Sequence, residues 1–206
     1  MSASLRTAGR TMGRTLWTGV RIMVILTVLL GVVYPLVMTL FGHLVFPWQS
    51  NGSQLTNRDG QVVGSALIGQ SFADADGNPL PQYFQPRPSA AGDGYDAASS
   101  GGSNLGPEDP RLIAEIEKRK AEIAAFNGVP ESAVPPDAVT ASGSGLDPDI
   151  SPAYAKIQID RVAGARHLPV ATVKALVDEH TQGRDLGYIG EPRVNVVELN
   201  LALDEL

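Results

Sequence analysis

The chain has 206 residues, no cysteine and a net charge of −6. All 22 Asp and Glu residues and 12 of the 16 Lys and Arg residues lie in residues 49–206, so this part carries −10 and the N-terminal part carries +4. This acidic balance excludes nucleic acid as a partner, because phosphate binding needs a basic face. The lack of cysteine excludes disulfides and thiolate metal sites.

The N-terminal part is organised around an apolar run. Residues 22–42 contain no charge and are rich in Val, Leu, Ile and Met, and a helix that crosses a bilayer needs about 20 such residues. We therefore predict a transmembrane helix over residues 16–44, preceded by a short, disordered cytoplasmic tail over residues 1–15. A cleaved signal peptide is the alternative, but its apolar region spans only about 7 to 15 residues and ends in a small-residue cleavage site, which residues 44–48 lack.

The orientation of this helix follows from its flanking charges. Four basic residues precede or open the apolar run, namely Arg6, Arg10, Arg14 and Arg21, and the next basic residue is Arg58. The positive-inside rule then places the N-terminus in the cytoplasm and residues 49–206 outside it. Trp17 and Trp48 are expected to lie at the two membrane interfaces.

Three residues inside the predicted span suggest a helical partner. Gly31 permits close approach of a second helix in lipid, and Pro35 leaves a backbone carbonyl of its own helix without a donor. We expect Gly31, Tyr34 and Pro35 to face a membrane partner, the alternative being a lone anchor.

Residues 49–206 are expected to form a single mixed α+β domain. Residues 61–69 predict a buried strand or hairpin, and residues 73–79 predict a plain turn, because they lack the acid and the Glu that a calcium loop requires. Residues 83–89 contain two prolines and should be extended, presenting Arg87. Residues 90–107 are typical of a flexible loop, the alternative being an ordered loop that contacts another protein.

The second half of this domain is expected to be mainly helical. A core helix is predicted over residues 107–128, a short strand over 138–141, and helices over 152–166 and 169–181. Ser151 followed by a proline is typical of a capped helix start. Residues 193–201 alternate as a strand does, with a short helical end over residues 202–206.

The chain lacks the short strings of known catalytic sites. None of the four lysines follows a glycine or an aspartate, so no P-loop and no pump phosphorylation string is present, and the three histidines form no zinc-hydrolase string. Asp147 with Asp149 could form an acid pair, and Ser142 or Ser144 could be a nucleophile, but capping and turn roles explain them more simply. We therefore predict no catalytic residue, no cofactor and no metal.

Several strings together resemble one family, in order and spacing over nearly the whole chain. The most specific are Tyr34-Pro35-Leu36, Tyr83-Phe84, Arg87-Pro88-Ser89, and residues 64–70, 100–107, 137–148 and 190–195. They resemble the C subunit of the bacterial Kdp potassium-transporting ATPase. The arginine-bearing tail before Leu16 is the least similar part.

The resemblance implies a noncatalytic subunit of a high-affinity potassium uptake complex in the plasma membrane. Its partners would be a channel-like A subunit, an ATP-hydrolysing B subunit and a small F subunit, besides membrane lipid. Arg87, Asn104 and Asp147 would contact these partners. The family is described as a catalytic chaperone for ATP binding by the B subunit, and because the arginine topology places this domain outside, we expect only an indirect effect on ATP use. Two alternatives are a membrane-anchored extracytoplasmic hydrolase and a free-standing envelope binding protein.

The charge asymmetry predicts the result of a topology experiment. A reporter that is active only outside the cytoplasm, fused after Leu206, should be active, because the four N-terminal arginines hold the opposite end of the helix inside. The measurement is reporter activity in whole cells, with the same reporter fused after Met12 as the inactive control. Activity of a cytoplasm-specific reporter after Leu206 would reverse the orientation.

Overall fold

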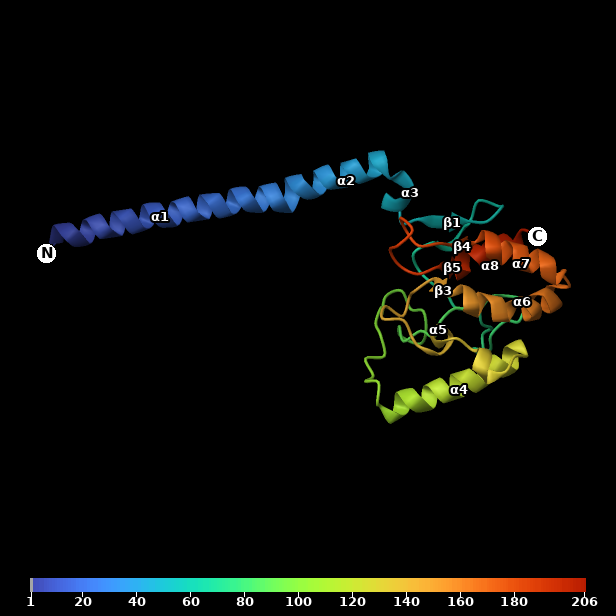
Figure 1. Cartoon of the computed structure of the whole chain (residues 1–206). Helices are drawn as coiled ribbons and strands as arrows, with labels where there is room; N and C mark the ends of the chain where they lie inside the picture. The colour runs from blue at the N-terminus through green and yellow to red at the C-terminus, as the bar shows by residue number, and fades with distance from the viewer. Residues whose placement is uncertain (1) are drawn as a thin grey trace. The chain divides into compact units, whose positions relative to one another are not determined.

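The computed structural model describes residues 2–206, with side chains from Met12 onward. The chain divides into two compact units, Met1–Gly52 and Ser53–Leu206 (Figure 1).

The first unit is a long helix followed by one short turn of helix. It comprises α1 (Ser2–Val28), the π-helical segment η1 (Leu29–Val33), α2 (Tyr34–Val45) and α3 (Pro47–Ser50). The stretch Met12–Val45 is long and apolar enough to cross a membrane. The predicted apolar helix is therefore present, but the disordered tail is wrong, because the backbone is helical from Ser2. Extending an existing helix costs little once its first turn has formed.

The π-helical segment has a local cause in the sequence. Pro35 has no backbone N–H and cannot donate to the carbonyl of Gly31, which lies four residues earlier. The preceding N–H, that of Tyr34, donates to the carbonyl of Leu29, five residues back. Such single π turns arise where the regular helical ladder is interrupted.

The second unit is a mixed α+β domain, as predicted. Its elements are β1 (Gln54–Thr56), β2 (Val62–Ser65), α4 (Pro110–Asn127), η2 (Glu131–Ala133), α5 (Pro136–Val139), β3 (Asp149–Ile150), α6 (Pro152–Arg166), α7 (Val170–Glu179), β4 (Thr181–Gln182), β5 (Arg193–Asn195) and α8 (Val196–Asp204). In the described residues the strands form an antiparallel hairpin of β1 and β2 and a three-stranded antiparallel sheet in the order β3-β5-β4. In the central strand, Val194 pairs with Ile150 on one side and with Thr181 on the other.

Caps determine where the helices begin. The Ser151 hydroxyl accepts a hydrogen bond from the N–H of Tyr154, so α6 begins and ends where the sequence predicts. Asp109 caps α4 in the same way, so this helix begins at Pro110 rather than at residue 107, and it ends at Gly128, whose φ is +66°. Helix α7 is one to two residues shorter at each end than predicted.

Three predicted strands need correction. Residues 138–141 are not a strand, because Pro136 occupies the first turn of the short helix α5. The strand predicted over residues 193–201 ends at Asn195, whose side chain accepts from the N–H groups of Val197 and Glu198 and so begins α8. The hairpin predicted near residues 61–69 is present, but Val62 is 57% exposed rather than buried.

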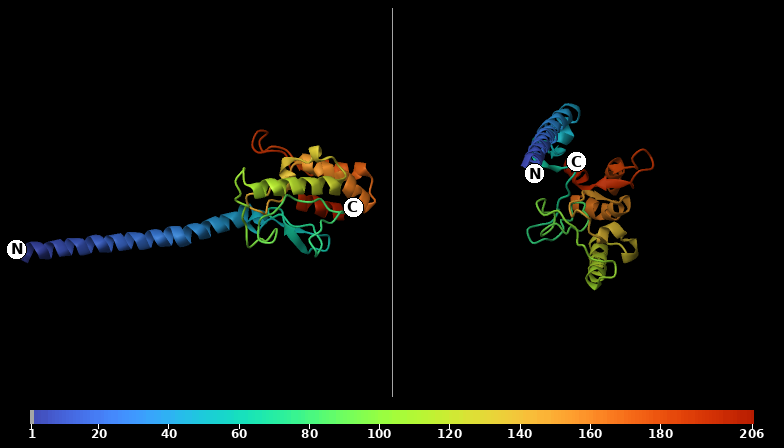
Figure 2. Two further views of the ribbon diagram at one scale, coloured as in Figure 1. Left: turned by 90° about the horizontal axis from the view of Figure 1, so that it is seen from below. Right: turned by 90° about the vertical axis from the view of Figure 1, so that its left-hand side faces the viewer.

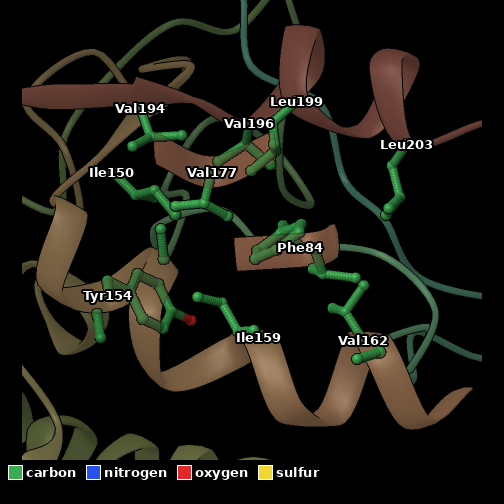
Figure 3. Close-up of a cluster of buried hydrophobic side chains, with 14 residues drawn as sticks. Phe84, Ile150, Tyr154, Ile159, Val162, Val177, Val194, Val196, Leu199 and Leu203 are labelled. Atoms are coloured by element: carbon green, nitrogen blue, oxygen red, sulfur yellow. The ribbon is translucent and has the colours of Figure 1, made fainter. Parts of the chain in front are cut away.

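The core lies between α6 and α8 (Figure 3). Tyr154, Ile159 and Val162 come from α6, and Val196, Leu199 and Leu203 come from α8. Phe84, which belongs to no helix or strand, is fully buried between them. The segment that carries Phe84 is therefore part of the core although it has no regular structure.

Side chains hold this segment in place as a neighbouring strand would. Asn200 on α8 accepts from the N–H of Phe84 and donates to its carbonyl, both at 2.9 Å. Gln158 on α6 pairs with the N–H and carbonyl of Gln85 in the same way, at 2.7 and 3.1 Å. Arg161 donates to the carbonyls of Pro81 and Tyr83. Buried backbone groups outside a sheet are thus satisfied by amide and guanidinium side chains.

This arrangement predicts a large effect of Asn200→Ala. The substitution leaves the buried N–H and carbonyl of Phe84 without partners, so the free energy of unfolding should fall by about 2–4 kcal/mol. The measurement is a urea titration of the full chain in detergent, with unfolding monitored by circular dichroism. Asn78→Ala, in an exposed turn, is the matched control and should cause a much smaller change. Equal effects of the two variants would contradict a structural role for Asn200.

Candidate functional site

The candidate site begins with a salt bridge between two residues that are 60 positions apart. Arg87 Nη1 lies 2.8 Å from Asp147 Oδ2, and the two side chains are 23% and 29% exposed. Arg87 follows the extended segment that carries Phe84, whereas Asp147 lies just before β3. Arg87 Nη2 also lies 3.5 Å from the carbonyl of Thr140, so one guanidinium joins three segments of the chain.

A second set of hydrogen bonds orders the loop that follows Arg87. The Ser89 hydroxyl donates to the carbonyl of Gly145 at 2.6 Å and accepts from the N–H of Tyr95 at 2.8 Å. The Tyr95 hydroxyl donates to the carbonyl of Arg87 at 2.6 Å. Burial raises the pKa of Tyr95, with the Asp147 charge as the next cause, so the phenol stays protonated and able to donate.

The glycine-rich strings 99–102 and 142–145 lie against each other. The N–H of Gly101 donates to the carbonyl of Ser144 at 2.8 Å. At Gly145 the φ is +68°, and a Cβ would lie 2.6 Å from the carbonyl oxygen of Gly101, so only glycine fits there. These contacts favour the ordered alternative for residues 90–107 over the flexible loop that composition indicated.

Asn104 does not join this site. Its side chain is exposed and donates to the carbonyl of Gly102 in its own loop, and its φ is +53°. Within the described residues, the structure therefore brings Arg87 and Asp147 together and gives Asn104 no hydrogen bond to either of them.

A cavity of about 440 Å³ adjoins the salt bridge and is lined mainly by charged side chains. Asp149 lies 3.3 Å from Arg193 across the β3-β5 pair. Burial, followed by the nearby Asp147 charge, raises the pKa of Asp149. Asp137 accepts from the N–H and the hydroxyl of Ser151, which tethers α5 to the start of α6.

The candidate catalytic groups named from sequence have structural partners here. The carboxylates of Asp147 and Asp149 each pair with an arginine, and Asp147 Oδ1 also accepts a hydrogen bond from the backbone N–H of Asp149. The Ser144 hydroxyl accepts from the N–H of Leu146, and Ser142 is buried with its hydroxyl 3.5 Å from that of Ser144. Among the described residues no three His, Asp or Glu side chains are grouped as a metal site would require. The arrangement can hold loops and present charges, which suits binding.

Sequence reasoning missed the residues that support the site. Asn200 and Gln158 were not singled out, although each is a polar residue on the apolar side of a helix. Arg161 was also missed. It stacks over the ring of Phe126 with 4.4 Å to the ring centroid, and burial lowers its pKa to about 10. Helical spacing of a polar residue within an apolar stripe is the signal that could have identified the two amides.

The three residues selected within the candidate membrane span lie together around the π-helical segment. Gly31 is within η1, and Tyr34 and Pro35 open α2. In the part of the chain that the structure describes, no heavy atom outside this helix lies within 4 Å of where a Gly31 Cβ would be. Within the described residues, the position of Gly31 is therefore open to a partner.

Together these features define a class of protein: a candidate membrane-spanning helix joined to an α+β domain whose polar loops are ordered by hydrogen bonds and a salt bridge. The family model described as KdpC, the K+-transporting ATPase c chain, matches residues 16–205. Among similar proteins are the potassium-transporting ATPase KdpC subunits of Gemmatimonas aurantiaca, 57% identical over 88% of this chain and 87% of the relative, and of Beijerinckia indica, 53% identical over 88% and 89%. The subunit of Mycobacterium tuberculosis is 50% identical over 95% of this chain and 100% of the relative.

The chain therefore belongs to the KdpC family. This supports the accessory-subunit interpretation of the sequence and not the alternatives of a free-standing binding protein or an anchored hydrolase.

The open position at Gly31 in the candidate membrane-spanning helix leads to a prediction for Gly31→Leu. The added side chain should block close approach of a partner helix while raising hydrophobicity, so co-purification of the complex should fall although membrane insertion persists. The measurement is recovery of the other subunits through a C-terminal tag, with insertion checked by alkaline extraction. Leu30→Phe, on a residue that is already large, is the control. Unchanged recovery with Gly31→Leu would reduce the helix to an anchor.

Proposed function

We propose that this KdpC-family chain is a noncatalytic accessory subunit whose domain, residues 53–206, docks outside the cytoplasm over the outer mouth of a potassium pathway. The observation that carries the proposal is the Arg87–Asp147 salt bridge, because it joins the loops that the family resemblance marks into one ordered polar surface. Such loops on a rigid scaffold are where contacts concentrate.

The location of the domain is supported by the charges around the membrane helix. The four N-terminal arginines, with no Lys or Arg between Arg21 and Arg58, favour an N-terminus in the cytoplasm. On this topology the domain cannot reach cytoplasmic ATP, so any effect on ATP binding by the hydrolysing subunit is transmitted through the membrane subunits.

The proposed partners are the channel-like A subunit, the ATP-hydrolysing B subunit and the small F subunit. Gly31, Tyr34 and Pro35 would contact a partner within the membrane. Arg87 and Asp147 would belong to the outer contact surface, and Asn104 would make a separate contact from its own exposed loop. The acidic charge of the domain could also concentrate cations, but the Debye length is about 8 Å at physiological ionic strength. Docking contacts should therefore matter more than net charge.

The experiment compares the salt bridge with exposed acids. Arg87→Ala or Asp147→Ala should reduce the potassium-stimulated ATPase activity of the assembled complex, because either change releases the loops that form the docking surface. Glu117→Gln and Glu122→Gln, on the exposed face of α4, should change the activity little. The measurement is ATP hydrolysis as a function of potassium concentration in the purified complex.

Two controls make the comparison specific. Asp178→Ala removes an exposed salt bridge to Lys174 and should leave activity unchanged, and thermal unfolding of each variant separates lost docking from lost folding. If neutralising the α4 acids had the larger effect at both low and physiological salt, an electrostatic funnel would replace docking as the explanation.

A further inference from the structure

The loop that joins β4 to β5, residues 184–191, protrudes from the folded domain in both views of Figure 2. It turns back on itself through an isolated antiparallel bridge between Asp185 and Ile189. The N–H groups of Tyr188 and Ile189 both donate to the carbonyl of Asp185, at 3.2 and 2.9 Å. The loop is therefore a small, internally hydrogen-bonded hairpin, which we call the 184–191 loop.

The tip of the 184–191 loop presents apolar side chains to solvent. Leu186 is 81% exposed and Tyr188 is 71% exposed, and Ile189 beside them is also exposed. Single exposed apolar residues are ordinary, but a group of three on one protruding turn is unusual for a surface that stays in water. Tyrosine is moreover among the residues enriched at the energetic centres of protein interfaces.

The backbone at this tip is held in a conformation that does not suit its sequence. Leu186 has a φ of +53°, in the left-handed region that residues other than Gly, Asn and Asp rarely adopt. Glycine or asparagine would adopt this conformation more easily, so a leucine here costs free energy as backbone strain. Such strain is typical of residues whose side chain has a use at that position.

Two salt bridges hold the base of the loop. Arg184 pairs with Glu191 at 2.6 Å, and Asp185 lies 3.7 Å from Arg193. Arg193 also pairs with Asp149, beside the Arg87–Asp147 site, so the loop and that site share one network of charges. A tip held in this way loses little conformational entropy when it binds.

Charge indicates which kind of partner covers the tip. The four charged residues at its base cancel, since Arg184 and Arg193 offset Asp185 and Glu191. A loop that inserts into an anionic membrane surface is typically flanked by an excess of Lys or Arg, and residues 49–206 carry −10. A protein surface with an apolar pocket fits this tip better than a lipid headgroup layer does.

We propose that the 184–191 loop inserts Leu186 and Tyr188 into an apolar pocket on another subunit of the Kdp complex. This inference rests on the proposed function, because it takes the domain to be docked on a partner subunit, and it deepens that function by naming the docking element. The rigid turn acts as the anchor, and the Arg87–Asp147 surface is a separate, polar part of the contact.

The first test uses a substitution that keeps the turn. Leu186→Asn accepts the positive φ but removes the apolar group, so the domain should unfold at the same or a higher temperature. The amount of partner subunits that stays bound to the tagged chain through repeated washes should fall by roughly tenfold or more. Ile113→Gln, an exposed apolar residue on α4, is the matched control and should retain the complex. Full retention with Leu186→Asn would overturn the inference.

The second test identifies what covers the tip. Because the natural chain has no cysteine, Leu186→Cys provides a single site on this chain for a thiol-linked photo-crosslinker in the full complex in membranes. A cross-link to another subunit of the complex is expected. The inference would be overturned if the probe cross-linked only to lipid, only to a second copy of this chain, or reacted with water alone.

Failure of the loop inference can be distinguished from failure of the proposed function. If the C-terminal reporter is active outside and Arg87→Ala lowers potassium-stimulated activity, but the Leu186 probe reaches no subunit, then the loop inference fails and the proposed function stands. If the reporter shows the domain inside while the probe still reaches a subunit, then the proposed function fails and the loop remains a docking element.

Discussion

The fold depends on two amide side chains that hydrogen-bond an extended segment as a neighbouring β-strand would. Asn200 and Gln158 each pair with both backbone groups of one residue, Phe84 and Gln85, and so allow an irregular segment to cross the core. Without them the buried N–H and carbonyl groups of that segment would have no partners, at a cost that hydrophobic burial of Phe84 would have to offset. Polar residues thus determine how an apolar core is built here.

The position of Arg87 follows from this arrangement. Two residues beyond Gln85, the chain is already aligned by α6 and α8, so the guanidinium reaches Asp147 and the carbonyl of Thr140. Once Asp147 is held, the glycine-rich strings on both sides of it can rest on one another. Contacts that begin at the core therefore order surface loops whose composition alone is typical of mobile loops.

The candidate membrane-spanning helix obeys a different constraint, because a bilayer core offers no hydrogen bonds to its backbone. Pro35 interrupts the regular ladder, and the helix absorbs the interruption as one π turn rather than as a break. The same turn carries Gly31, and among the described residues no heavy atom outside this helix lies within 4 Å of where its Cβ would be. A local backbone defect and a small residue at one place form the kind of surface that a second helix can approach closely.

The sequence by itself determined the apolar helix, the α+β class, the capped start of α6, the turn over residues 73–79 and the family. These depend on composition, local capping or strings of neighbouring residues. It also selected Arg87 and Asp147, but not that they meet, and it missed Asn200, Gln158 and Arg161. Only the tertiary structure decided that α5 and α8 are helices rather than strands, that Asn104 lies apart, and that Leu186 and Tyr188 are exposed. Each of these depends on contacts between residues far apart in the chain or on which side of an element faces the core, and a hydrophobic pattern of period two or period 3.6 over a few residues does not contain that information.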